Sequence, residues 1–406
     1  MKSSSVNESL SGESETSRSL HRYVRALAVM TILLIWWGAA TTTKQAGMAF
    51  ADWPLSLGSV NPPGWLKHMV PFLEHSHRLL ATVVGVMTLI LFGWAYVRNL
   101  ARLGEFLGLF FWLGLTFALF IVAGKERQDA DRKQFYLLIA SGAALLPILW
   151  LVWSWAKRSW SVVVRLSALA LLMVTGQAIL GGLRVTEVSD TFAVIHGCLA
   201  QGFFCVIILI GFASSSRWHH RSDVVTESQI KAVKLWSSVL VAAIFGQLIL
   251  GALMRHHHRS GLADTGLFLT DGKWFPGFAS ESIDGDPLIL LLMFAHKYWA
   301  LVIFGLGSGL TLWLWTRRDI PVGLLRHSMV ISVLLVAQIA MGVAVILTGS
   351  PEHKRFWITN FHVINGLALL ATAFALAVRC WLAGRKVTLL AGNPSAGSGA
   401  LPRETP

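Results

Sequence analysis

Ten stretches of about 20 mostly apolar residues restrict this chain of 406 residues more than any other feature. A helix of that length crosses the roughly 30 Å hydrocarbon core of a bilayer. In lipid only helices and closed barrels satisfy their backbone, and these continuous runs lack the alternation of barrel strands. The sequence therefore predicts an all-α polytopic membrane protein, with spans at 24–43, 75–97, 105–124, 134–156, 161–183, 192–213, 233–253, 288–315, 325–348 and 358–383.

Composition agrees, since 54% of the residues are hydrophobic and only 14% are charged, whereas soluble domains carry about 25% charged residues. The net charge of +13 would suit a nucleic-acid binder, but the Lys and Arg residues lie in short loops between apolar runs. That placement indicates membrane orientation, and we expect no nucleic-acid partner. Cys198, Cys205 and Cys380 all lie inside apolar runs, so a disulfide framework is not expected.

Six basic loop or terminal segments fall on one side of the predicted membrane, whereas the loop from Lys125 to Lys133 on the other side carries charges of both signs. The other side holds the loops that contain Trp53, Asp131 and the stretch from Asp264 to Asp286. By the positive-inside rule both termini are expected in the cytoplasm, which predicts a multi-pass protein of the cell's inner (cytoplasmic) membrane.

The chain repeats itself. "GQAILGGLR" and "AQIAMGVAV" each lead to a helix with a histidine, and "KQAGMAFADWP" and "HRSGLADTG" each precede another. This predicts two pseudo-symmetric four-helix bundles, with the third and fourth spans as an inserted pair that has no counterpart in the second half. The expected divisions are a disordered cytoplasmic N-terminus (1–20), a first bundle (21–100 and 160–215), the inserted helix pair (101–159), a second bundle (230–385) and a flexible tail (386–406).

Four histidines occupy matching places in these halves: His77, His196, His296 and His362, each a few residues inside the same end of a helix. A lone membrane histidine more often makes a helix–helix hydrogen bond, but four at one depth and at repeat positions favour metal ligation. Two neutral imidazoles on facing helices suit heme iron. Zinc is disfavoured because the apolar runs hold no matching cysteine or second carboxylate.

Glu74 breaks the symmetry of the two halves. It precedes His77 by three residues, so both side chains project from one helix face, whereas the equivalent residue of the second half is Met293. One interpretation is that the first half carries out chemistry while the second holds a redox cofactor. The other is that Glu74 is a hydrated interfacial acid.

The basic residues that follow two of the histidines, Arg78 and Lys297, allow two interpretations. They could pair with heme propionates or extend to the membrane interface. His75 is expected to assist the site indirectly at most, and the run from His256 to His258 to be a solvated basic segment.

At these residues the chain resembles a known family, heme A synthase, the membrane enzyme that converts heme O to heme A for cytochrome oxidase. The resemblance rests on Glu-x-x-His-Arg (Glu74 to Arg78), on "ADWP" (Ala51–Pro54), on the Gln-x-x-x-Gly segments and on the ordered histidines. It covers roughly residues 20–100 and 160–385.

The resemblance implies an N-terminal bundle that takes heme O as substrate, matching His77 and His196 as iron ligands and Glu74 as the catalytic residue. It implies a C-terminal bundle that holds heme b, matching His296 and His362. In the implied reaction one porphyrin methyl group is hydroxylated twice in succession. The resulting geminal diol loses water and leaves a formyl group. Implied partners are heme O, an electron donor or acceptor and the lipid bilayer, with the heme O-producing farnesyltransferase and a homo-oligomer left open.

The chain also departs from the family pattern. The third and fourth spans are extra, the outer-loop cysteine pair is missing, and Lys44 stands where an arginine is expected. A diheme b-type electron-transfer cytochrome linked to quinone is the alternative function, and a heme exporter or chaperone is a third. The alternative explains four histidines equally well but leaves Glu74 unexplained.

Overall fold

A computed structural model describes residues 2–126, 129–215, 227–257, 266–270, 272–277, 287–317, 320–348 and 352–391. Side chains are not described for 2–17, 227–230, 257, 287, 352–355 and 383–391 within these ranges. The described part contains ten helices long and apolar enough to cross a membrane, which confirms the predicted all-α polytopic class. The helices are α1 (Lys2–Thr43), α2 (Met69–Tyr96), α3 (Leu100–Lys125), α4 (Ala130–Lys157), α5 (Val162–Glu187), α6 (Asp190–Ala213), α7 (Glu227–His257), α8 (Pro287–Trp315), α9 (Val322–Leu347) and α10 (Glu352–Ala391).

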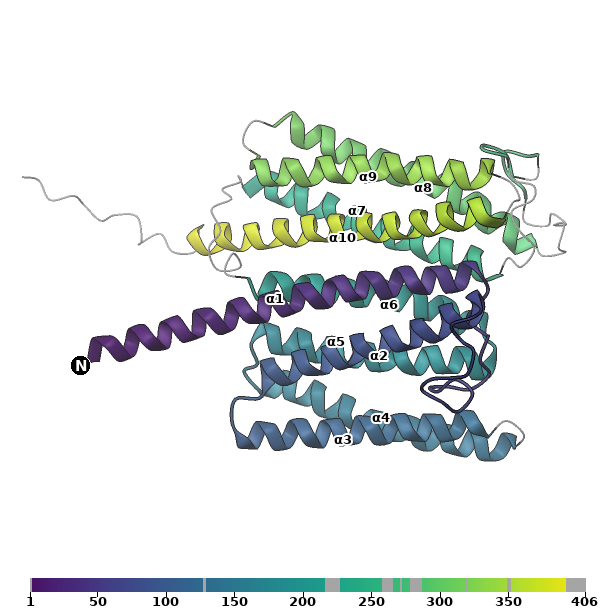
Figure 1. The fold of residues 1–406 in the computed structure, drawn as a ribbon. Coiled ribbons are helices and arrows are strands. Elements are labelled where there is room, and N and C mark those ends of the chain that lie inside the picture. Colours follow the sequence, from purple (N-terminus) through teal and green to yellow (C-terminus); the bar gives the residue numbers. More distant parts are fainter. Residues whose placement is uncertain are drawn as a thin grey trace, which may run out of the picture.

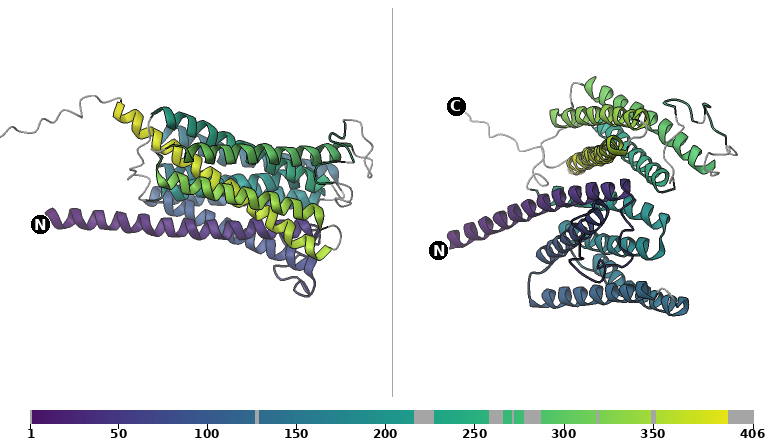
Figure 2. Two further views of the ribbon diagram at one scale, coloured as in Figure 1. Left: turned by 90° about the horizontal axis from the view of Figure 1, so that it is seen from above. Right: turned by 45° about the vertical axis from the view of Figure 1, so that its right-hand side comes forward.

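The helices pack in pairs that succeed one another across the molecule (Figure 1). α1, α2, α5 and α6 pack around one another, and so do α7, α8, α9 and α10. The pair α3 and α4 lies outside α2 and α5, and the two groups of four meet where α1 and α6 contact α7 and α10. Figure 2 shows the same succession from two further directions. The exact domain boundaries, the disordered N-terminus and the flexible tail stay predictions. The structure describes no side chains in 1–17 and 383–406.

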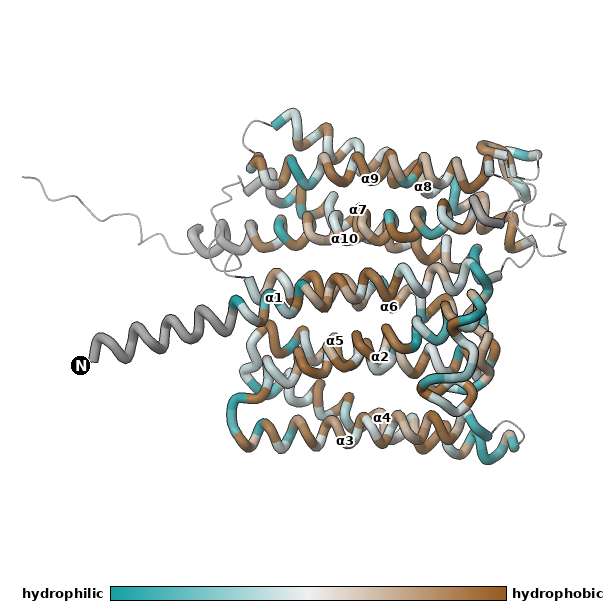
Figure 3. The backbone as a smooth tube through the Cα atoms, in the orientation of Figure 1, coloured by the Kyte–Doolittle hydropathy of each residue, from teal (hydrophilic) through white to brown (hydrophobic). Residues whose placement is uncertain are grey.

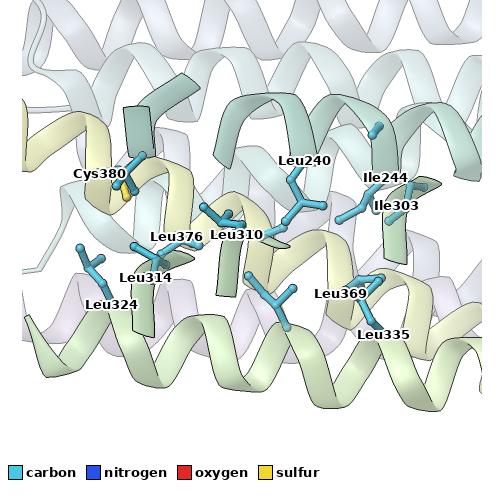
Figure 4. Packing of buried hydrophobic residues seen from close by; sticks show 14 of the residues in the cluster. Leu240, Ile244, Ile303, Leu310, Leu314, Leu324, Leu335, Leu369, Leu376 and Cys380 are labelled. Carbon is cyan, nitrogen blue, oxygen red and sulfur yellow. The ribbon is translucent and has the colours of Figure 1, made fainter. Parts of the chain in front are cut away.

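Each group of four has its own apolar core. In the second, Leu240 and Ile244 of α7 meet Ile303 of α8 and Leu369 of α10 (Figure 4). In the first, a separate cluster joins α1, α2, α5 and α6. Many apolar side chains also remain exposed along the helices, as expected where lipid is the solvent. Figure 3 shows the hydrophilic residues gathered toward the helix ends and loops.

Polar side chains cap the first turns of helices that begin only a few residues after the preceding helix ends. Ser189 accepts a hydrogen bond from the backbone N–H of Phe192 at the start of α6 (3.3 Å), and Val188 before it adopts a left-handed backbone conformation with φ of 51°. This corner reverses the chain between α5 and α6 within two residues. Asp129 caps α4 in the same way, accepting from the N–H of Arg132 at 2.9 Å. Such caps satisfy N–H groups that the first helical turn leaves without partners.

The loop 44–68 and the described residues of the second loop (266–270 and 272–277) lie at one end of the bundles, which we call the long-loop side. The inserted pair is tied to the first bundle at both ends. On the long-loop side Lys133 of α4 pairs with Glu187 of α5 at 2.7 Å. On the opposite side Arg158 pairs with Glu105 of α3 at 2.7 Å and donates to the hydroxyl of Tyr96 at 3.2 Å.

Candidate functional site

The four histidines lie at similar depths beneath the long-loop side. They occur between six and ten residues after the first residue of α2, α6, α8 and α10. At 1.5 Å of rise per residue, this places them roughly 9–15 Å along their helices. The start of α2 at Met69, six residues before the predicted start of that span, puts His77 in the third helical turn. The ligand candidates therefore lie inside the membrane-spanning part of the bundles.

Each histidine faces a glycine on the helix that precedes its own. A Cβ added at the glycine would lie between 3.0 and 3.4 Å from Cε1 of the imidazole, a closer contact than side chains ordinarily tolerate. The absence of a side chain thus leaves room for each ring. The four pairs are Gly38 with His77, Gly181 with His196, Gly251 with His296, and Gly342 with His362.

The rings are oriented in a common way. Cε1 and Nδ1 are the ring atoms nearest the glycine, and in His196, His296 and His362 the Nε2 atom lies more than 4 Å from the added Cβ. The Nδ1 atoms of all four histidines are buried and have no hydrogen-bond partner within the part of the chain that the structure describes. Buried polar atoms without partners are rare, so the four rings share an unusual environment.

The Gln-x-x-x-Gly segments also acquire a structural role. Gln177 and Gln247 donate to the backbone carbonyls of His196 and His296, each at 2.9 Å. The amide one helical turn before the glycine therefore fixes the helix that carries the histidine.

In the last of the four helix pairs the amide contacts the ring itself. Nε2 of Gln338 lies 3.2 Å from Nε2 of His362, while its Oε1 accepts from Asn365 at 2.6 Å. An amide N–H only donates, so Nε2 of His362 accepts this hydrogen bond with its lone pair. Iron binding at Nε2 would therefore require Gln338 to move away from the ring. In α1 the residue four before Gly38 is Leu34, so this support is missing beside His77.

The second pair has a separation that suits a metal between the rings. The ring centroids of His296 and His362 are 6.5 Å apart, although their helices lie diagonally across the bundle and pack mainly on α7 and α9. A metal–nitrogen bond of roughly 2.0 Å on each side places two trans imidazole centroids about 6–6.5 Å apart. No group of three or more His, Cys, Asp or Glu side chains placed to hold a metal ion occurs among the described residues. Two facing imidazoles fit a metal that brings further ligands of its own, as heme iron does.

Glu74 is buried beside the first pair, with 3% of its surface exposed. One carboxylate oxygen accepts from the backbone N–H of Phe50 at 3.1 Å, and the other forms an ion pair with Arg78. The acid is therefore not a hydrated interfacial group. At the equivalent place in α8, Met293 is also buried and offers no charge.

Arg78 and Lys297 hold the two long loops. Arg78 donates to the carbonyls of Asp52 (2.7 Å) and Leu55 (2.6 Å), and Lys297 donates to those of Gly266 (3.2 Å) and Leu269 (2.8 Å). Their donor groups are thus directed at loop carbonyls in this structure, and pairing with heme propionates or extension to the membrane interface stay predictions.

The two loops contain the same tight turn. Ser56 pairs with Ser59 in the first loop, and Thr270 pairs with Lys273 in the second. The signal was present in the sequence as Leu-Ser-Leu-Gly-Ser and Leu-Thr-Asp-Gly-Lys, and it extends the internal repeat into the loops. Residues 258–265, which carry most of "HRSGLADTG", lie outside the described part of the chain.

His75 is a residue that sequence reasoning left open. It is buried, and its two ring nitrogens contact the hydroxyl of Ser56 and the carbonyl of Val60, each at 2.9 Å. It therefore fastens the first loop to α2. His256, by contrast, is half-buried at the end of α7, and the side chains of 257 and 258 are not described.

Asp52 strengthens the same loop from outside the membrane. Its carboxylate accepts from the backbone N–H groups of Leu57 (2.9 Å) and Gly58 (2.7 Å). Burial acts to raise the pKa of Asp52, but these N–H groups and the charge of Arg78 outweigh it and hold the pKa below its usual value. The first loop is thus held on α2 by contacts at both Asp52 and Glu74.

Comparison with known proteins decides the family. The sequence model of a family described as cytochrome oxidase assembly proteins matches residues 138–384, more than half of the chain. The chain belongs to the cytochrome oxidase assembly protein family. A relative in Shouchella clausii (strain KSM-K16) named heme A synthase is 29% identical over 220 residues, which is 52% of this chain and 68% of the relative.

These matches confirm the family that the sequence motifs indicate. The family match contains His196, His296 and His362 but begins within α4, after Glu74 and His77. Assignments in α2 therefore rest on the internal repeat and on the geometry above.

Proposed function

We propose that this member of the cytochrome oxidase assembly family is a heme A synthase, which oxidises one methyl group of heme O to the formyl group of heme A. The observation that supports it best is the asymmetry of two otherwise matching histidine sites. Both have glycines against their imidazoles. Among the described residues, a buried carboxylate, Glu74, occurs at the first site, where the second has Met293. An acid that is present at one of two duplicated sites suggests a division between catalysis and electron storage.

In this proposal His77 and His196 bind the iron of heme O as substrate, and Gly38 and Gly181 leave room for their imidazoles. Glu74 places negative charge at the same depth as the ligands, in a medium of low dielectric constant where charge interactions are strong. It stabilises positive charge that develops on the substrate. Its contacts with Phe50 and Arg78 hold it in position before the reaction, so little reorganisation is needed.

His296 and His362 would hold heme b, which when bound supplies one-electron redox chemistry. The residues of the second half keep that site rigid. Gln247 fixes the backbone of His296. The two groups of four helices are in direct contact through α1, α6, α7 and α10.

We further propose the membrane placement that the basic loops predict: the cell's inner membrane, both termini cytoplasmic and the long loops outside. An electron donor or acceptor and the farnesyltransferase that makes heme O remain proposed partners, and a homo-oligomer remains open. A quinone-linked diheme cytochrome is the second candidate, because four histidines would serve it equally well.

The test is the identity of the hemes extracted from the purified protein. The protein is co-expressed with a heme O supply, purified, and its hemes are extracted and separated by chromatography. We expect heme A or its hydroxylated precursor together with heme B. The matched control is His77→Ala, which should retain heme B and lose the oxidised products. Heme B alone in the unmodified protein would reject the synthase and select the cytochrome.

A further inference from the structure

Arg184 lies in the last turn of α5, three residues after the glycine that faces His196. Residues three apart share a helix face, so Arg184 projects from the glycine side about one turn closer to the long-loop side. The equivalent residue in the second half, three after Gly342, is Val345. The first site therefore has a cation near its polar end that its duplicate lacks at this position.

The guanidinium of Arg184 rests on the first long loop. A Cβ added at Gly47 would lie 2.7 Å from Nη2 and 3.2 Å from Nη1 of Arg184, so the loop backbone and the guanidinium are in close contact. This contact restricts where the guanidinium of Arg184 can point. Gly47 is in effect a requirement for this position of Arg184.

Two acids act electrostatically on Arg184, but neither forms an ion pair with it within the described residues. Its charge interacts with those of Glu74 and Asp190. Glu74, however, already pairs with Arg78 and accepts from Phe50. No hydrogen bond or ion pair is made by the side chain of Arg184 within the described residues, and the cation of Arg255 is also within electrostatic range. A half-buried guanidinium in this setting gains free energy from an added anion.

The expected substrate of the first site carries such an anion. A tetrapyrrole bound between two histidines has its propionate carboxylates at one edge, and that edge lies toward the aqueous side because charge in the hydrocarbon is costly. We infer that Arg184 binds a propionate carboxylate of the tetrapyrrole in the first histidine site. This assignment rests on the proposed function. Arg184 is thereby a substrate-binding residue that fixes which edge of the macrocycle faces the long loop.

The test compares two probes that differ only in charge: hemin, and hemin dimethyl ester, in which both carboxylates are blocked. Each is titrated into the purified full-length protein, and absorbance that depends on His77 is obtained by subtracting the His77→Ala titration. Wild-type protein should bind hemin more tightly than the ester. Arg184→Gln should weaken hemin binding by about tenfold to a hundredfold and leave ester binding within about twofold.

Two further variants make the result specific. Arg184→Lys retains the charge and should recover part of the preference for hemin. Arg132→Gln removes an exposed arginine on the same side, with 71% of its side chain accessible, and should change neither affinity. Thermal unfolding of each variant verifies that it is folded, and if Arg184→Gln is not, the lysine variant carries the comparison.

Equal weakening of both probes in Arg184→Gln would overturn the inference, because it would show that Arg184 shapes the site without binding a carboxylate. Unchanged hemin binding would overturn it as well and would leave Arg184 as an interfacial cation. A wild-type protein with no His77-dependent binding of either probe would reject the proposed function of the first site, and the inference with it. That outcome is distinct from a failure confined to the arginine.

Discussion

The guanidinium of Arg255 on α7 donates a hydrogen bond of 2.6 Å to the carbonyl oxygen of Ala39 on α1, 216 residues earlier in the chain. Arg255 also donates to the hydroxyl of Thr43, which lies 3.1 Å from Oδ1 of Asn360 on α10. Asn360 is two residues from His362. Arg255 of the second half thus binds the C-terminal end of α1 in the first half, next to both histidine sites.

Replacing this cation should loosen the contact between the halves. We expect Arg255→Gln to lower the free energy of unfolding by about 1–3 kcal/mol, because hydrogen bonds from a charged donor are lost and carbonyls are left unpaired. Chemical unfolding in detergent measures the effect. The control is Arg326→Gln, at an exposed position on the opposite side of the membrane. An equal loss in both variants would contradict a specific role for Arg255.

The sharpest test of catalysis concerns Glu74. Glu74→Gln should leave heme b in place, since those ligands belong to the other bundle, and should leave heme O bound through His77 and His196. Turnover to heme A should fall about 10²–10³-fold, the usual effect of losing one preorganised electrostatic contact. The amide can still accept from Phe50, so the loop contact is largely retained. Single-turnover conversion of heme O is the measurement.

Two results would reject that role for Glu74. Conversion at the wild-type rate would show that its charge is unimportant to the reaction. Loss of all heme would show that it supports the fold or His77, and the proposed division of labour would lose its main support.

The histidines of the second half should form a low-spin heme b site. His296→Ala or His362→Ala should remove most of the heme b absorbance, because each deletes one of two axial imidazoles. Absorbance and electron paramagnetic resonance spectra of the purified variants provide the test. A full low-spin spectrum in both variants would contradict the assignment.

The glycine that faces His296 can be tested without touching a ligand. A Cβ at Gly251 would lie 3.1 Å from Cε1 of His296, so Gly251→Ala should displace the ring. Overpacking of roughly 1–3 kcal/mol should weaken heme b binding by about fivefold to a hundredfold. Gly305→Ala is the matched control, since nothing lies within 4 Å of a Cβ there. Heme occupancy at limiting heme supply compares the two. Similar occupancy would mean that the glycine is unimportant for the ring position.

Ten spans predict opposite locations for the two ends of α4. Reporter fusions after Asp131 and after Lys157 should therefore report different sides of the membrane. Both on one side would mean that α3 and α4 do not each cross the bilayer.

The sequence by itself determined the spans and the ligand candidates. The apolar run at 288–315 corresponds to α8 from Pro287 to Trp315. Each helix must cross the hydrocarbon core by itself, so the length of its apolar run can be found in the local sequence. His296 and His362 could be paired from the repeat alone, since duplication preserves position along the chain. Even Glu74 could be singled out, because its duplicate is Met293.

Only the tertiary structure decided what these residues touch. The hydrogen bond from the N–H of Phe50 to Glu74 joins residues 24 apart in the chain. The bond from Lys297 to the carbonyl of Leu269 joins residues 28 apart, and the bond from Arg255 to the carbonyl of Ala39 joins residues 216 apart. Such contacts depend on how the helices cross and on where each long loop returns, and no local pattern records either. Periodicity and hydropathy describe a helix in its solvent, whereas the partner of a buried charge is chosen by packing between helices.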